Sequence, residues 1–206
     1  MHEKWTREHI FRPRNQVPTW QNITYENTIC HYWPRKDNPY HIRLTIGGDK
    51  LPHSSASGSP AVTLLEAKTI FNSVISTPDY QFICANINDY FICSPMEYFE
   101  YIKINFFWII KGIHIQYNLY SLVEPDCYVY CELRTCMYRL KQASRIAFDN
   151  LVKLLTPNGY LLIGKSPGLW KHQTRSTVFI LCFDFFGIKA NSGDDANHLI
   201  NTIKNI

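Results

Sequence analysis

The spacing of apolar residues along the chain changes between a period of two and a helical period, and this predicts the order of the elements. Residues 43–46 alternate polar and apolar side chains ahead of two glycines, a pattern typical of a strand that ends in a turn. Between residues 64 and 75 the apolar side chains recur at helical spacing, which predicts a helix with Ser59 as its N-cap and Pro60 at its first position.

Two runs in the middle of the chain predict strands. Residues 81–87 form a mainly apolar run that suits a buried strand, and residues 89–93 are expected to extend it until Ser94-Pro95 breaks it. Residues 127–133 combine β-forming residues with alternating cysteines and predict another strand.

The last third of the chain predicts a helix, a hairpin and a final helix. Residues 143–155 have apolar side chains at helical spacing and precede a helix-ending TPNG sequence. Residues 177–183 form a β-rich run, residues 184–187 resemble a turn, and residues 188–190 return as the second arm of a hairpin. An Asp-Asp pair at 194–195 begins the last helix. The predicted fold class is α+β, with helices packed on one face of a mainly antiparallel sheet.

Composition and cysteine content limit the class of protein. The chain has 206 residues, of which 46% are hydrophobic and 18% charged, which excludes a disordered chain and allows a core that needs no disulfides. Seven cysteines, an odd number, and a start unlike a signal peptide predict reduced thiols and an intracellular location, in the cytoplasm or nucleus. The longest apolar stretch, residues 102–115, is shorter than the roughly 20 residues that span a bilayer, so no membrane is expected as a partner.

Charge is distributed unevenly along the chain. Residues 76–133 contain two lysines and seven acidic residues, a net charge of −5, whereas residues 134–175 contain eight basic residues and one acidic residue, a net charge of +7. A basic block is typical of a surface that binds a polyanion such as a nucleic acid. A solvated helix face explains the same pattern without any function, and charge alone leaves both interpretations open.

Six short segments, in the same order, resemble the reverse-transcriptase domain of the Pol polyproteins of LTR retrotransposons of the copia and gypsy kind. They are IRLTIGGD at 42–49, NSVISTP at 72–78, NINDYF at 86–91 with SPM at 94–96, MYRLKQASRIA at 137–147, SPGLWKH at 166–172 and LCFDFFG at 181–187. The resemblance extends from about Ile23 to Lys204, nearly the whole chain.

The resemblance implies the fingers and palm of a polymerase. Residues 1–80 correspond to part of the fingers and residues 81–206 to the palm, with no thumb and no RNase H region. The implied activity is RNA-directed DNA polymerisation, a template-directed nucleotidyl transfer with two Mg²⁺ ions as cofactors. The implied partners are an RNA or DNA primer-template and deoxynucleoside triphosphates.

The family holds its two Mg²⁺ ions with one aspartate on a central strand and an Asp-Asp pair in the neighbouring hairpin. At the corresponding positions this chain has Asn86, Asp184 and Phe185, so only Asp184 keeps a carboxylate and remains a candidate metal ligand. Asp89 does not replace the first carboxylate, because residues 86 and 89 of one strand lie on opposite faces. Since hard cations need several carboxylate oxygens, we expect little or no polymerase activity from this copy.

Four further positions keep family-like residues. By resemblance, Arg43 clamps the incoming triphosphate and Gln142 contacts the incoming nucleotide or the template. Lys141 and Arg145 offer phosphate contacts. Each also has an ordinary alternative, as a surface arginine on a strand or as part of a solvated helix start. A non-catalytic nucleic-acid-binding remnant that uses Arg43, Lys141 and Arg145 is therefore the alternative function.

Two glycines of the family are replaced in this chain, by Cys136 and Arg139. A side chain at a position of positive φ costs about 1–2 kcal/mol, so each replacement is expected to strain the backbone if its residue has such a φ. Changes at catalytic and glycine positions, with the hydrophobic pattern intact, are typical of a degenerate copy of a mobile element.

Two other motifs support weaker interpretations. Cys127, Cys131 and Cys136 suggest zinc, but their spacing fits neither a zinc knuckle nor a zinc ribbon, and strand alternation explains the first two as core thiols. Asp194 and Asp195 resemble a catalytic pair, but negative charge at a helix start explains them better.

Overall fold

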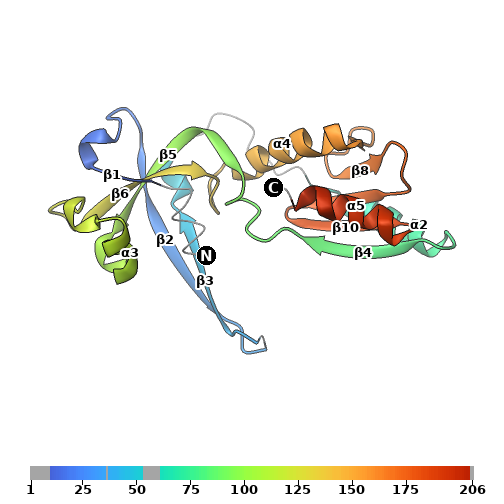
Figure 1. Ribbon diagram of the computed structural model, residues 1–206, viewed down its shortest axis with the longest axis horizontal. Helices are drawn as coiled ribbons and strands as arrows, with labels where there is room; N and C mark the ends of the chain where they lie inside the picture. The colour runs from blue at the N-terminus through green and yellow to red at the C-terminus, as the bar shows by residue number, and fades with distance from the viewer. Residues whose placement is uncertain (1–9, 36, 53–60, 205–206) are drawn as a thin grey trace. The chain divides into compact units, whose positions relative to one another are not determined.

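The computed structural model describes residues 10–35, 37–52 and 61–204, which form two compact units (Figure 1). Unit 1 comprises Met1–Ala56 and Phe91–Ala143, and unit 2 comprises Ser57–Tyr90 and Ser144–Ile206. Each unit combines two separate stretches of chain, so neither is a single continuous segment. The α+β class is confirmed, and the assignment of residues 1–80 to fingers and 81–206 to palm stays a prediction.

Unit 1 contains a five-stranded sheet in the order β1-β6-β5-β2-β3. Its strands are β1 (Ile10–Arg12), β2 (Ile23–Tyr32), β3 (Tyr40–Ile46), β5 (Pro95–Asn105) and β6 (Tyr128–Thr135). Neighbouring strands pair antiparallel, except that β2 and β5 are parallel. Its helices are short: α3 (Lys111–Gln116) and the 3₁₀ turns η1 (Arg14–Gln16), η2 (Gly48–Lys50), η3 (Phe106–Trp108) and η4 (Leu119–Ser121).

Strand β6 lies between β1 and β5 in the sheet of unit 1 and confirms the strand expected over residues 127–133. Val129, Cys131 and Leu133 are fully buried, as is Ile102 of the adjacent strand β5. A strand that is covered in this way favours small and branched apolar side chains at successive inward positions. The cysteine of this strand is therefore a core side chain.

Unit 2 contains a second five-stranded sheet, antiparallel throughout, in the order β4-β10-β9-β8-β7. Its strands are β4 (Gln81–Asn86), β7 (Tyr160–Leu162), β8 (Leu169–His172), β9 (Val178–Cys182) and β10 (Phe185–Ala190). Its helices are α2 (Leu64–Ile75), α4 (Ala143–Leu155) and α5 (Gly193–Ile203), and the 3₁₀ turn η5 (Thr156–Asn158) follows α4.

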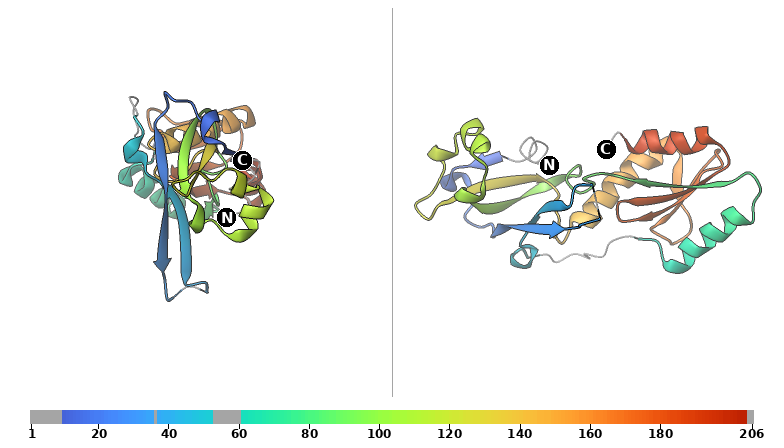
Figure 2. Two further views of the ribbon diagram at one scale, coloured as in Figure 1. Left: turned by 90° about the vertical axis from the view of Figure 1, so that its left-hand side faces the viewer. Right: turned by 90° about the horizontal axis from the view of Figure 1, so that it is seen from below.

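Helices cover both faces of the sheet of unit 2 (Figure 2). Helices α4 and α5 pack on one face, where Leu151 and Leu199 join Phe186 of β10 in a hydrophobic core. Helix α2 lies on the other face, where the rings of Phe71 and Phe82 have centroids 4.5 Å apart. Because β4 is apolar on both faces, it needs cover on both. The expected one-sided packing therefore holds for α4 and α5 and is wrong for α2.

The first helix begins later than the sequence predicts. Thr63 is the N-cap of α2, and it forms a capping box with Glu66, in which each side chain satisfies a backbone N–H of the other residue. The expected N-cap Ser59 and the expected first residue Pro60 lie outside the described residues. The N-cap is corrected to Thr63.

The other two long helices agree with the sequence prediction. Helix α4 covers the expected residues 143–155, and η5 then ends at Gly159, which has φ 83°. Ser192 caps α5, with Asp194 and Asp195 in the first turn. These carboxylates interact favourably with the positive end of the helix dipole.

Strand β4 confirms the strand expected from residue 81, but it ends at Asn86. Residues 88–93 form turns, with Asp89 at φ 57°, so the expected extension through Cys93 is wrong. Strand β5 begins at Pro95, because a proline is tolerated as the first residue of a strand. Asp89 therefore lies in a turn and not on the strand of Asn86, so the expected reason for excluding it, opposite faces of one strand, does not apply.

Candidate functional site

The three positions that the sequence resemblance assigns to metal-binding carboxylates lie together in unit 2. Asn86, the last residue of β4, is directly opposite Phe185, the first residue of β10. One residue further on, the backbone N–H of Ile87 donates to the carbonyl oxygen of Asp184 at 3.0 Å. The site is thus built where β4 ends beside the start of β10, and the two strands lie side by side in Figure 1.

A tight hairpin connects β9 to β10 and carries Asp184. Strand β9 ends at Cys182 and β10 begins at Phe185, and these two residues pair with each other. The hairpin is confirmed, but its turn consists of residues 183 and 184 instead of the expected 184–187. Phe183 makes so short a turn possible by adopting φ 58°, a conformation that glycine and asparagine adopt more readily.

The side chains of Asn86 and Phe185, which pair beside this turn, are exposed. Ile83 and Ala85 of β4 pack toward the core under α4 and α5, so Asn86 lies on the opposite face of the sheet, and Phe185 lies there with it. Asn86 is exposed, and the Phe185 ring is 57% exposed. A phenyl group with this exposure contributes little to packing.

The donor set at this turn does not fit a pair of Mg²⁺ ions. It offers one carboxylate, on Asp184, beside the neutral amide of Asn86 and a phenyl ring, on Phe185, that has no ligand atom. Two divalent cations need several carboxylate oxygens between them. Among the residues that the structure describes, no group of three or more His, Cys, Asp or Glu side chains is placed to hold a metal ion.

Two of the three cysteines that suggest zinc are also poor ligands. Cys131 and Cys136 are buried in unit 1. Burial raises the pKa of the Cys131 thiol far above its usual range and that of Cys136 to about 12. Since zinc binds the thiolate, both side chains are better explained as part of the core.

Arg43, Lys141 and Gln142 lie in unit 1, and each contacts other residues of that unit. The Arg43 guanidinium lies over the ring of Tyr138, 5.8 Å from its centroid. Lys141 Nζ donates to the backbone carbonyl oxygen that follows η2 at 3.0 Å. Gln142 Nε2 donates to Glu100 Oε1 at 2.8 Å. These contacts hold the segment between β6 and α4 in place.

This segment packs tightly against the end of β3 and against Gly48, which follows it. Ile46 N–H donates to the carbonyl oxygen of Tyr138 at 3.2 Å, and a Cβ on Gly48 would lie 2.1 Å from the carbonyl oxygen of Arg139. Glycine is therefore required at position 48. Arg139 itself has φ 71°, whereas Cys136 is not among the described residues with positive φ. Of the two positions where the resemblance implies a glycine, Arg139 strains the backbone and Cys136 does not.

Arg145 lies on α4 in unit 2 and forms an exposed ion pair with Asp149, with 3.0 Å between Nε and Oδ2. The predicted site residues are thus divided between the units. Arg43, Lys141 and Gln142 belong to unit 1, and Asn86, Asp184, Phe185 and Arg145 belong to unit 2.

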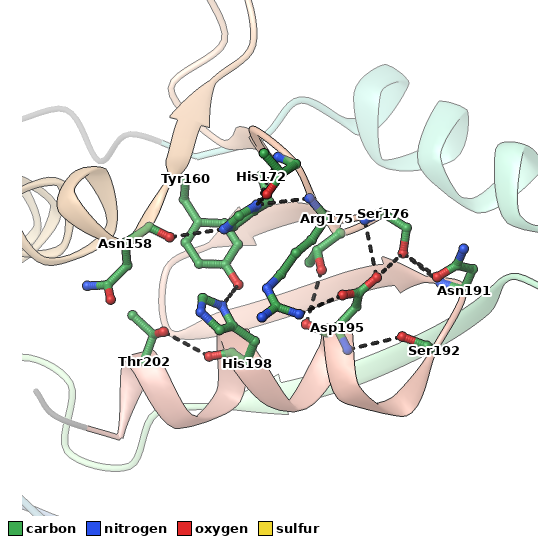
Figure 3. Close-up of polar contacts among 12 residues, drawn as sticks. Asn158, Tyr160, His172, Arg175, Ser176, Asn191, Ser192, Asp195, His198 and Thr202 are labelled. Carbon is green, nitrogen blue, oxygen red and sulfur yellow. Dashed lines mark hydrogen bonds and ion pairs between the residues drawn. The ribbon is translucent and has the colours of Figure 1, made fainter.

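A polar cluster that the sequence analysis does not identify joins the β8–β9 loop to α5 (Figure 3). The carboxylate of Asp195 accepts hydrogen bonds from the hydroxyl and the backbone N–H of Ser176, and it forms an ion pair with Arg175 at 2.9 Å. These contacts lower the pKa of Asp195, and the hydrogen bond from the Ser176 hydroxyl has the largest effect. The Tyr160 hydroxyl and His198 Nδ1 are 2.8 Å apart in the same cluster. The polar run before β9 is the one signal in the sequence, and it does not reveal its partners on α5.

No helix in the described part of the chain is long and apolar enough to span a membrane. Comparisons with protein-family models, with curated proteins and with solved structures found no match. Function is therefore inferred from the sequence resemblance and from the geometry within each unit.

Proposed function

We propose that this chain is a fragment of a retrotransposon reverse-transcriptase domain whose polymerase site has degenerated, so that it performs little or no nucleotidyl transfer. One observation supports this most. The three positions that the resemblance assigns to metal-binding carboxylates are far apart in the sequence, yet Asn86 lies opposite Phe185 and next to Asp184.

The chemistry of the three side chains explains why activity is lost. The Asn86 amide supplies no negative charge, and the Phe185 ring supplies no ligand atom. Asp184 alone leaves most of the charge of two divalent cations unbalanced, and nucleotidyl transfer by this family depends on both cations. The proposal therefore combines positions that lie together with side chains that cannot hold the two ions.

Restoring the carboxylates tests this proposal. The double variant Asn86→Asp with Phe185→Asp places two carboxylates directly opposite each other, with Cβ atoms about 5 Å apart. We expect this variant to gain Mg²⁺-dependent primer extension, and its Tm to rise with added Mg²⁺, because the cation offsets repulsion between paired like charges. The unchanged chain is expected to show neither effect.

A matched control keeps the same chemical changes but moves them away from the paired positions. Asn88→Asp with Phe183→Asp adds the same charge, and we expect no Mg²⁺-dependent extension from it. Robust extension by the unchanged chain would contradict the loss of activity. A double revertant without extension and without stabilisation by Mg²⁺ would contradict the assignment of the site.

The second candidate function is a non-catalytic nucleic-acid-binding remnant. The observation that favours it is that Arg43, Lys141 and Arg145 are all exposed. Exposed basic side chains bind phosphates with an affinity that falls as the salt concentration rises, because binding releases counterions and this release is less favourable at high salt.

Salt-dependent binding to a DNA or RNA duplex tests this second function. Lys141→Ala with Arg145→Ala should weaken binding and reduce the salt slope by about 2, roughly one for each phosphate contact. Lys153→Ala with Lys171→Ala removes the same charge from two other exposed positions and should leave most of the binding. This function would be excluded if the chain did not bind the duplex, or if its affinity for the duplex did not change with salt concentration.

A further inference from the structure

The imidazole of His172, the last residue of β8, caps the loop that leads to β9 (Figure 3). Its Nδ1 accepts hydrogen bonds from the backbone N–H groups of Thr174 at 3.1 Å and Arg175 at 3.0 Å. Its Nε2 lies 3.1 Å from the carbonyl oxygen of Asn158. A carbonyl oxygen only accepts and a backbone N–H only donates, so the ring is neutral and carries its proton on Nε2.

Helix α5 holds the same loop from its other side. Asp195 accepts hydrogen bonds from the Ser176 N–H at 3.2 Å and from the Ser176 hydroxyl at 2.6 Å. Its carboxylate also pairs with Arg175 at 2.9 Å. Among its contacts, the loop is thus held by an imidazole on one side and a carboxylate on the other.

Two rings and an arginine of the loop lie beside His172. The ring of His198, on α5, has its centroid 5.4 Å from that of His172, and the ring of Tyr160, on β7, lies 4.8 Å away. Arg175 adds a cation from the loop itself. Burial, followed by the charge of Arg175, lowers the pKa of His198. The acidic group of the cluster, Asp195, already binds the loop.

We propose that His172 is a pH switch, whose neutral ring holds the β8–β9 loop closed and whose protonation at Nδ1 releases it. A protonated imidazole carries N–H groups on both nitrogens, so Nδ1 would face two backbone donors and both backbone hydrogen bonds would be lost. The Thr174 hydroxyl, 3.5 Å from Nδ1, would remain as the one acceptor in reach. The contacts of Ser176 with Asp195 persist at that pH, since the pKa of Asp195 is lowered. Protonation therefore opens one side of the loop and leaves the other side attached to α5.

Amide hydrogen exchange of the full chain between about pH 7.5 and about pH 5.5 tests the switch. After correction for the intrinsic pH dependence of exchange, protection of the Thr174 and Arg175 amides should fall toward acid pH. The limit for release coupled to one proton is about tenfold per pH unit. The Leu181 amide of β9, which donates to Gly168 at 2.7 Å, should keep its protection.

Two variants separate His172 from other titrating groups. Asparagine can accept a backbone N–H two residues on and does not titrate in this range, so His172→Asn should make the protection independent of pH. His31→Asn, at an exposed histidine of unit 1, should retain the pH dependence of the unchanged chain. The proposal would be overturned if the Thr174 and Arg175 amides of the unchanged chain kept the same protection at both pH values. It would also be overturned if His172→Asn lost the same protection at acid pH as the unchanged chain.

A second measurement keeps the proposal testable if His172→Asn fails to fold. Nitrogen-15 NMR of the unchanged chain should show the His172 ring with an unprotonated Nδ1 and a protonated Nε2 at neutral pH. The opposite tautomer at neutral pH would overturn the proposal.

Discussion

At Arg139 the side chain and the backbone conformation conflict. Its φ of 71° lies in the left-handed region, which costs a non-glycine residue about 1–2 kcal/mol. Its carbonyl oxygen fills the space beside Gly48, so the backbone cannot relax without opening that contact. Packing therefore maintains the strain.

We expect Arg139→Gly to raise the free energy of unfolding by about 1 kcal/mol, because glycine adopts this φ without strain although it gains entropy in the unfolded chain. Urea unfolding measures the change. Arg145→Gly is the matched control, since it removes the same side chain from a helix, and it should lower the free energy of unfolding by about 1 kcal/mol. A loss of stability in Arg139→Gly would contradict the argument.

Two buried glutamates of unit 1 have pKa values shifted in opposite directions. Burial raises the pKa of Glu26, and a hydrogen bond from Thr28 offsets this only in part. Burial alone would raise the pKa of Glu132 as well, but hydrogen bonds from Arg134 and Arg12 and the Arg12 charge lower it below the ordinary value of 4.5. The ionised form thus destabilises the fold at Glu26 and stabilises it at Glu132.

The two glutamine variants should therefore change the Tm in opposite directions near pH 7. Glu26→Gln should raise it, and the gain should vanish as pH falls below the ordinary pKa of 4.5. Glu132→Gln should lower it, and the loss should shrink as pH falls from 4.5 through the lowered pKa of the folded state. Thermal melts at several pH values measure both, and changes of the same sign near pH 7 would refute the assignment.

At the scale of elements, the sequence correctly predicts the helices and strands that have a regular spacing of apolar residues or clear start and stop residues. Helix α4 has an apolar stripe and a proline–glycine stop, α5 has acidic residues at its start, and β9 and β10 are separated by a short turn. The turn itself is displaced from the prediction, because a phenylalanine at positive φ is not a turn signal. Local sequence thus fixes the existence of these elements better than their limits.

The sequence analysis does not predict β2 or β5. Strand β2 buries Thr24 and Glu26, two polar residues that give no apolar alternation. Strand β5 begins with a proline and contains a bulge where its pairing with β6 shifts. Both strands are buried by their neighbours in the sheet. The residue pattern within one strand does not show which strands lie beside it.

At the scale of the whole molecule, segments that are continuous in sequence are divided in space. The acidic segment 76–133 contributes residues 76–90 to unit 2 and residues 91–133 to unit 1. Most of the basic segment 134–175 belongs to unit 2. The net charges of these two sequence segments therefore do not give the net charge of either unit.

Each unit has its own buried side chains, which predicts a local response to core mutations. Trp170 is 1% exposed in unit 2 and stacks on Phe179 with ring centroids 5.8 Å apart. We expect Trp170→Ala to cost about 3–5 kcal/mol and to reduce amide protection in β8, β9 and α5, while β5 and β6 keep theirs. Trp108→Ala, at a side chain that is 65% exposed in unit 1, is the control and should have little effect. Equal loss of protection in both units would contradict this.

The sequence by itself determined the α+β class, the helices α4 and α5, the β9–β10 hairpin and the presence of Asn86, Asp184 and Phe185 as an amide, a carboxylate and a phenyl ring. These features depend on local periodicity or on residue identity, which the chain carries without folding. Only the tertiary structure decided that Asn86 faces Phe185, that Arg139 is strained, and that His172 and Asp195 hold one loop between them. Each of these depends on strand register or on contacts between residues distant in sequence, and those are set by packing rather than by local preference.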